Sequence, residues 1–171
     1  MVRLAALAGV LVLAACSQAE TGPALAQASE TAQISDTAVA THPVSGLNLI
    51  DLAVVRGDKR IPFRVELADT PQAQAKGLMF RTELGDFEGM LFPSQEPQAR
   101  SFWMKNTPLS LDIIFVGVDG RISNIAADTV PYSLDSVPSD GLSIAVLELR
   151  AGRAKALGIV PGDRVEWTLP D

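Results

Sequence analysis

The sequence contains only one cysteine and one histidine, Cys16 and His42. A single cysteine cannot close a disulfide within the chain, so the fold must be stabilised by its apolar core. With no further cysteine or histidine, the rest of the chain cannot form a zinc site of cysteine and histidine ligands. For the same reason it cannot form a Ser-His or Cys-His catalytic triad. No glycine-rich phosphate loop follows an expected strand either. We therefore expect no metal and no cofactor.

The chain also has fewer positively charged than negatively charged residues. The chain has 14 lysine and arginine residues against 20 aspartate and glutamate residues, which gives a formal net charge of −6 at pH 7. An acidic chain is repelled by phosphate backbones and by anionic membrane surfaces. We therefore expect no nucleic-acid partner.

Residues 1–15 have the pattern of a secretory signal peptide. Arg3 supplies a positive charge, residues 4–15 are apolar, and small residues come directly before Cys16. The apolar run is too short to cross a bilayer, which takes about 20 residues. Because Leu13-Ala14-Ala15-Cys16 is similar to a bacterial lipobox, we expect Cys16 to be lipidated and to become the new N-terminus. The alternative is an ordinary signal peptide followed by a coincidental cysteine.

The expected cellular location follows from lipidation of Cys16. Acyl chains on Cys16 would hold the protein on the periplasmic side of the cell envelope, and Ser17, rather than aspartate, favours the outer membrane over the inner one. Residues 16–46 lack aromatic side chains and sustained periodicity, so they are expected to be the lipidated cysteine and a flexible tether in which His42 is solvated. Residues 47–171 suffice for one domain, which we expect to be monomeric.

Apolar and alternating runs predict a mainly β domain. Expected strands cover residues 49–56, 60–67, 89–93, 102–105, 109–118, 121–127, 144–149 and 164–169. Expected helices cover residues 72–76, behind a Thr-Pro start signal, and 152–157, before a glycine. The polar runs 94–99 and 131–141 are expected to be loops. The predicted fold class is a β-sandwich or partly closed barrel of about eight short strands with two short helices.

The hairpin expected at residues 109–127 carries the first unusual feature. Asp119-Gly120 matches a two-residue type I′ turn, and pairing outward from that turn sets Ile114 opposite Ile125. This register places Asp112 on an apolar face. A buried ionised carboxylate is costly unless a cation or hydrogen-bond donors pair with it. Asp112 therefore needs a partner from another part of the chain.

A second carboxylate interrupts an apolar strand in the same way. Glu148 shares a face with Ile144 and Val146 in the strand expected at residues 144–149. Glu66 is different, because it alternates with apolar neighbours as Arg64 does, so both are expected to be half exposed. The simplest expectation is that the two interrupting carboxylates meet polar groups from other elements. The candidate ligand-binding residues are Arg81, Trp103, Lys105, Asn106, Asp112 and Glu148.

Three interpretations of this group remain open. In the first, Asp112 pairs with Arg81 or Lys105, Glu148 pairs with the other cation or with backbone amides, and the network is structural. In the second, Trp103 offers a stacking face and the charged groups bind a small polar ligand, such as a sugar or an envelope fragment. In the third, Asp112 and Glu148 form a glycosidase-type catalytic pair, although a nearby base would lower both pKa values and oppose the acid role. We expect a non-enzymatic binding or accessory module.

Several motifs also occur in a characteristic order. They are Gly77-Leu78-Met79-Phe80-Arg81, Gly89-Met90-Leu91-Phe92, Phe102-Trp103-Met104-Lys105-Asn106-Thr107, Leu111-Asp112-Ile113, Asp119-Gly120, Leu147-Glu148, Ala151-Gly152 and Gly162-Asp163. Through them, the stretch from about residue 54 to residue 167 resembles the DUF192 family, a domain of unknown function. The resemblance implies a compact, mostly β domain that is usually exported. It implies no activity, because the family has none established.

Overall fold

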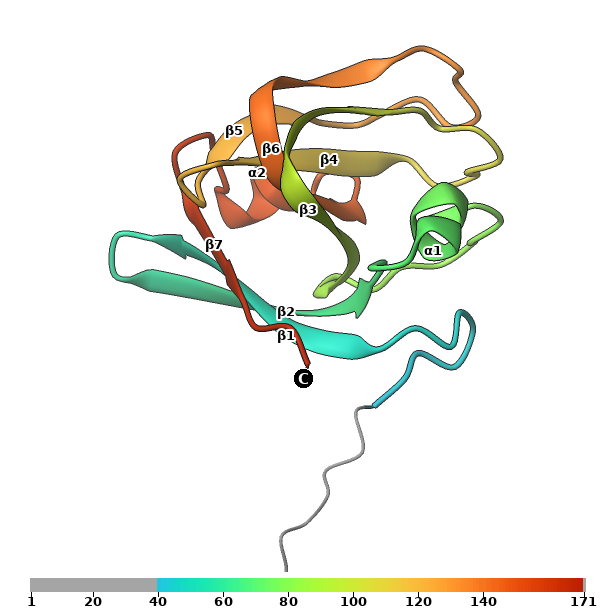
Figure 1. Ribbon diagram of the computed structural model, residues 1–171, viewed down its shortest axis with the longest axis horizontal. Helices are drawn as coiled ribbons and strands as arrows, with labels where there is room; N and C mark the ends of the chain where they lie inside the picture. The colour runs from blue at the N-terminus through green and yellow to red at the C-terminus, as the bar shows by residue number, and fades with distance from the viewer. Residues whose placement is uncertain (1–39, 171) are drawn as a thin grey trace, which may run out of the picture. The chain divides into compact units, whose positions relative to one another are not determined.

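Seven strands and two short helices make up the computed structural model, which describes residues 40–170 (Figure 1). The elements are β1 (Leu49–Arg56), β2 (Lys59–Leu67), α1 (Pro71–Lys76), β3 (Glu88–Phe102), β4 (Leu111–Gly117), β5 (Ile122–Ala126), β6 (Val137–Arg150), α2 (Arg153–Leu157) and β7 (Arg164–Trp167). The predicted signal peptide, Cys16 and the tether up to residue 39 lie outside the described residues. Within residues 40–170, no helix is long and apolar enough to cross a membrane.

The seven strands form one strongly curled sheet. Their order is β5-β4-β6-β3-β2-β1-β7, and every neighbouring pair is antiparallel except β2 and β3. A parallel pair needs a crossover, and the segment containing α1 supplies it. The edge strands β5 and β7 approach each other at one bridge, between Arg121 and Arg164, where Val165 N donates to Gly120 O at 2.9 Å. The mainly β class with two short helices is therefore confirmed, whereas the sheet has seven strands instead of about eight and is not closed, since β5 and β7 meet at a single bridge.

Each face of the sheet carries its own apolar cluster. The first cluster draws buried residues from all seven strands and from α2, among them Val54, Val65, Ile114 and Leu147. The second cluster combines one side of β3, β4 and β6 with side chains from the connecting segments, such as Leu78 and Met104. Each fully buried side chain of this size contributes about 1.5–3 kcal/mol to folding. Because both faces of β4 are covered, any polar residue on it is buried.

The central hairpin has the predicted pairing but a different turn. Ile114 lies opposite Ile125, as expected. Gly120 has a φ of 74°, whereas Asp119 is not among the residues with positive φ, so the two-residue type I′ turn is wrong. Gly120 N donates to Gly117 O at 3.0 Å, and Gly117 N donates to Arg121 O at 2.7 Å. This is a three-residue loop that ends in a left-handed glycine, a common alternative hairpin connection.

Of the two segments expected as loops, 94–99 lies wholly within strand β3, whereas in 131–141 the loop ends at residue 136 and residues 137–141 belong to β6. β3 and β6 are long strands that continue past the core as an antiparallel ribbon, with an irregularity between Pro93 and Gln98. Most residues of this ribbon are exposed on both sides. Without a buried face, a strand needs no apolar alternation, so its sequence resembles that of a loop.

The last residues of the expected tether belong to the folded domain. Thr41 forms a bridge with Asn48, and Leu49 N donates to Ala40 O at 2.7 Å. The domain therefore begins about seven residues earlier than expected. The His42 side chain lies against the folded domain and is only 15% exposed, whereas it was expected to be solvated.

Candidate functional site

Glu148 is the buried polar residue around which the candidate site forms. It lies on β6, near the middle of the sheet, opposite Met90 of β3 and Ile113 of β4. These neighbours belong to the second apolar cluster, and Glu148 is only 5% exposed. Within residues 40–170, neither a hydrogen bond nor an ion pair reaches its carboxyl group. Burial therefore raises the pKa of Glu148 to about 8.

A pocket of about 350 Å³ opens beside this carboxyl group. Its walls come from the end of α1 and the residues after it, from the end of β3, and from the loop between β3 and β4. The lining residues that matter most are Lys76, Arg100, Trp103, Lys105, Thr107 and Glu148. At pH 7 a carboxyl group with a pKa of about 8 is mostly protonated, so Glu148 can both donate and accept a hydrogen bond.

The pocket carries positive charge that no nearby acid neutralises. Lys76, Arg100 and Lys105 line it, and in the described part of the chain none of them pairs with a carboxylate. Arg100 instead donates to Ser94 Oγ at 2.8 Å, and partial burial lowers its pKa. Glu148, the single carboxyl group among the lining residues, is mostly neutral at pH 7. The pocket is therefore a cationic site in a chain whose net charge is negative.

Trp103 forms part of the pocket wall and is half exposed. The Lys105 ammonium lies 5.0 Å from the centre of the Trp103 ring, a cation–π contact. Asn106 follows with a φ of 55°, a left-handed conformation that asparagine tolerates better than most residues. Asn106 Nδ2 lies 3.8 Å from Met79 Sδ, and Met79 lines the pocket. Asn106 thus borders the pocket without lining it.

Asp112 lies apart from this pocket. It faces Leu149 across β4 and β6, whereas its neighbour Ile113 faces Glu148, so the two carboxylates lie on opposite faces of the sheet. Asp112 Oδ1 accepts from Asp128 N at 3.0 Å and from Gly152 N at 3.1 Å. Asp112 Oδ2 accepts from Ala154 N at 2.8 Å. The expectation of an arginine or lysine partner is therefore wrong, because three backbone amides replace it.

Arg81 also lies apart from the pocket, paired with a residue that sequence reasoning missed. Arg81 Nη1 lies 2.6 Å from Glu66 Oε1, and Glu66 is buried. His42 completes the group, with Nε2 at 3.3 Å from Arg81 Nη2 and Nδ1 at 3.7 Å from Glu66 Oε2. Glu66 alternates along β2 in the same way as exposed Arg64, so its sequence pattern gives no sign of burial. Segment 40–48 lies beside it, since His42 approaches its carboxylate and Leu67 N donates to Asn48 O at 2.8 Å.

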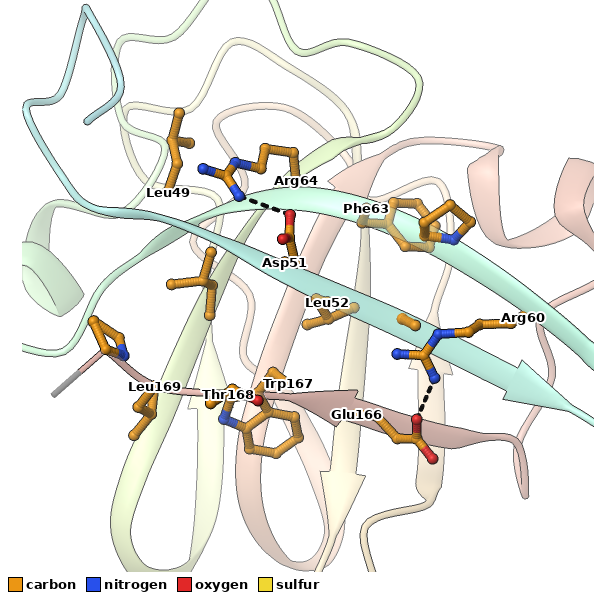
Figure 2. A pocket seen from close by; sticks show the side chains of 14 residues that line it. Leu49, Asp51, Leu52, Arg60, Phe63, Arg64, Glu166, Trp167, Thr168 and Leu169 are labelled. Atoms are coloured by element: carbon orange, nitrogen blue, oxygen red, sulfur yellow. Dashed lines mark hydrogen bonds and ion pairs between the residues drawn. The ribbon is translucent and has the colours of Figure 1, made fainter. Parts of the chain in front are cut away.

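A larger hollow on β1, β2 and β7 has fewer polar groups available to bind a ligand. It measures about 620 Å³, and its charged side chains pair with one another (Figure 2). Arg64 Nη1 lies 2.7 Å from Asp51 Oδ1, and Arg60 pairs with Glu166. No buried carboxyl group without a partner lines this hollow. The Glu148 pocket is therefore the stronger candidate within residues 40–170.

Among the comparisons with known proteins, one gives the family and none gives an activity. A crystal structure of a protein of unknown function from Novosphingobium aromaticivorans DSM 12444 has a TM-score of 0.74 and 55% identity, covering 77% of this chain and 94% of that one. A Sinorhizobium meliloti 1021 protein, provisionally described as a transcription regulator, has a TM-score of 0.68 and 37% identity, covering 71% and 95%. No curated protein matches. The family model described as DUF192, "Uncharacterized ACR", matches residues 53–167. The chain therefore belongs to the DUF192 family.

Proposed function

We propose that this protein is a non-enzymatic binding module that holds a small acidic sugar, or a comparable hydroxylated anion, in the Glu148 pocket. One observation carries the proposal. Glu148 is buried, has no partner within the described chain, and lines a pocket whose other charged groups are cations. Because the carboxyl group lines the pocket, the hydrogen bonds that a buried polar group normally has would come from a bound ligand, or from water while the pocket is free.

Each group in the pocket suits one part of such a ligand. The protonated carboxyl group of Glu148 can donate to a sugar hydroxyl or ring oxygen. The exposed ring of Trp103 offers an apolar face to a sugar ring. Lys105 and Arg100 can attract a carboxylate, the group that distinguishes an acidic sugar from a neutral one. The site thus combines stacking, hydrogen bonding and charge.

Two other activities are less well supported. A glycosidase-type mechanism needs two carboxyl groups flanking one bond, yet Asp112 lies on the other face of the sheet and Glu148 is the single carboxyl group lining the pocket. A role in DNA binding, which the description of the Sinorhizobium relative would suggest, requires a positive surface. The net charge of −6 opposes it.

Calorimetric titration tests the proposal. The full chain is titrated with D-galacturonate and with D-galactose, which differ at the carboxylate. We expect galacturonate to bind at least about tenfold more tightly, since a charge-assisted hydrogen bond is worth about 1.5–3 kcal/mol. Trp103→Ala and Glu148→Leu should abolish this binding. Leu169→Ala, in the hollow of Figure 2, should leave it unchanged.

Failure takes two clear forms in this experiment. The ligand site lies elsewhere if galacturonate binds equally well to wild type and to Glu148→Leu. The acidic-sugar assignment is wrong if galactose and galacturonate bind with the same affinity, or if neither binds.

We also propose an exported lipoprotein, acylated at Cys16 and located in the outer membrane. The support is the sequence of residues 1–17 alone, which lie outside the described structure. Labelling of expressing cells with radioactive palmitate tests it, together with separation of inner and outer membranes. We expect label on the wild-type protein in the outer-membrane fraction and none on Cys16→Ser. Label that survives Cys16→Ser would reject acylation at this residue.

A further inference from the structure

We infer that the ligand is a chain of acidic sugars rather than a single one, and that Phe80, Trp103 and Tyr132 form an aromatic platform for its successive rings. The inference rests on the proposed function, because the platform would extend the Glu148 pocket. It adds the size and class of the ligand and two binding residues outside the pocket.

The first observation is the exposure of these aromatic side chains. Phe80 is 70% exposed, Trp103 is 50% exposed and Tyr132 is 62% exposed. They lie on three different connections, after α1, after β3 and between β5 and β6. Exposed apolar side chains that gather in one patch are a frequent mark of a binding surface, whereas single ones are ordinary, so the position of these three relative to one another matters.

Backbone hydrogen bonds join the three connections to one another. Phe80 N donates to Asn106 O at 2.8 Å, and Tyr132 N donates to Thr107 O at 3.1 Å. Asn106 and Thr107 belong to the same loop as Trp103, and Thr107 lines the Glu148 pocket. The neighbour of Phe80 on its other side, Met79, lines the pocket as well. The three connections therefore meet beside the pocket, and Phe80 itself lines a neighbouring hollow together with Arg81 and Glu83.

The second observation is the backbone conformation of the two outer aromatics. Phe80 has a φ of 64° and Tyr132 a φ of 62°. This left-handed region is unfavourable for bulky residues, and such strain concentrates at binding sites. Packing of the ring cannot account for a bulky residue at either position, since both side chains are mostly exposed. A ligand that stacks on the rings would account for both.

Charge and polarity indicate which ligand fits. Lys105 and Asn106 lie in the same loop as Trp103, and Lys76 lies close in sequence to Phe80. Cationic groups therefore lie in the pocket beside Trp103, with the Lys105 ammonium over its ring, and they suit a sugar that bears hydroxyl and carboxylate groups. A chain of acidic sugars presents both repeatedly. Exposed Val130 and Leu134 flank Tyr132, so a protein partner is the alternative that the test must separate.

The test measures affinity against chain length. The full chain is titrated with galacturonate, trigalacturonate and hexagalacturonate. We expect affinity to rise at least about tenfold from the monomer to the hexamer, because each added aromatic contact contributes about two- to tenfold. Phe80→Asn and Tyr132→Asn keep a residue that tolerates positive φ. Each should weaken hexamer binding about two- to tenfold and leave monomer binding unchanged.

Controls separate this inference from the proposed function. Val118→Ala removes an exposed apolar side chain at the β4–β5 turn and should bind every length as wild type does. Monomer binding that depends on Glu148, with no dependence on chain length and no effect of Phe80→Asn or Tyr132→Asn, would overturn the platform and keep the pocket. That result would instead favour a protein partner as the ligand of Phe80 and Tyr132. Absence of binding at every length would reject the proposed function itself.

Discussion

Asp112 and Glu148 lie on neighbouring strands of the sheet and face opposite sides of it. Asp112 is opposite Leu149, and Glu148 is opposite Ile113, one position along each strand. The first carboxylate accepts three backbone hydrogen bonds, whereas the second has none from the described chain and borders a pocket. Two similar interruptions of apolar strands thus have different surroundings, because backbone amides hold one carboxylate whereas the other borders a pocket.

The ionisation of Glu148 should make stability depend on pH. Burial raises the pKa of Glu148 from 4.5 to about 8, so the folded state keeps a proton that the unfolded state releases between these pH values. Its contribution to the free energy of unfolding is therefore constant below about pH 4.5, falls as pH rises towards 8, and levels off above it. The total loss is on the order of 5 kcal/mol.

Urea unfolding of wild type and Glu148→Gln at pH 5, 7 and 9 measures this effect. The difference between the two proteins removes the contributions of all other groups. We expect the variant to gain stability relative to wild type as pH rises, by several kcal/mol between pH 5 and 9. A constant difference across this range would show that Glu148 does not titrate as a buried acid.

Replacement of Asp112 should destabilise the fold without changing the pocket. Asp112→Asn substitutes an amide donor for one oxygen, so at least one of the amides of Asp128, Gly152 and Ala154 loses its acceptor. We expect a loss of about 2–4 kcal/mol in chemical unfolding, because these are charge-assisted bonds at buried positions.

The matched control for this substitution is Asp119→Asn, at an exposed turn where the carboxylate accepts from Arg121 N. Its cost should stay below about 1 kcal/mol. Equal costs for the two variants would contradict the structural role of Asp112. Galacturonate binding by folded Asp112→Asn should match wild type, and loss of that binding would link the residue to the site.

The ion pair of Arg81 and Glu66 should contribute far more than a surface pair. Arg81→Met leaves the buried Glu66 carboxylate without its cation, which costs about 3–5 kcal/mol. Arg64→Met breaks a pair of similar length with Asp51, whose side chain is 89% exposed, and should cost at most about 1 kcal/mol. Thermal and urea unfolding of both variants give the comparison. Similar values would show that Glu66 is not buried against Arg81 in solution.

The charge of Lys105 should set the preference for acidic ligands. Lys105→Gln removes a cation that lines the pocket and has no carboxylate partner in the described chain. We expect galacturonate affinity to fall about tenfold and its salt dependence to weaken. Lys155→Gln, an exposed lysine on α2, is the matched control and should change neither. Equal effects of both substitutions would indicate a general charge effect rather than a site.

Much of the fold could be predicted because apolar periodicity and capping residues are local signals. Strand β1 matches its expected range, and Thr70 Oγ1 accepts from Ala73 N at the start of α1, as the Thr-Pro signal predicts. Glycine 158 ends α2 in a left-handed conformation, again as expected. The outer halves of β3 and β6 could not be recognised, because a ribbon exposed on both faces has no apolar pattern.

The residues of the candidate site could be predicted only in part. Sequence reasoning selected Trp103, Lys105 and Glu148, and the structure places all three around one pocket. It also grouped Asp112 with them, since a carboxylate on an apolar strand looks the same whichever face it occupies. The face is decided by register with the neighbouring strand, and the partners of Asp112 come from backbone amides that have no sequence signature. Long-range contacts of this kind appear only in the folded chain.

Crystals of the protein soaked in galacturonate give the most direct test of the central claim. We predict density for one sugar ring against Trp103, with a ring oxygen or hydroxyl within hydrogen-bond distance of Glu148 and the carboxylate facing Lys105. An empty pocket at a concentration that saturates calorimetric binding, or a sugar bound in the hollow of Figure 2, would contradict the account.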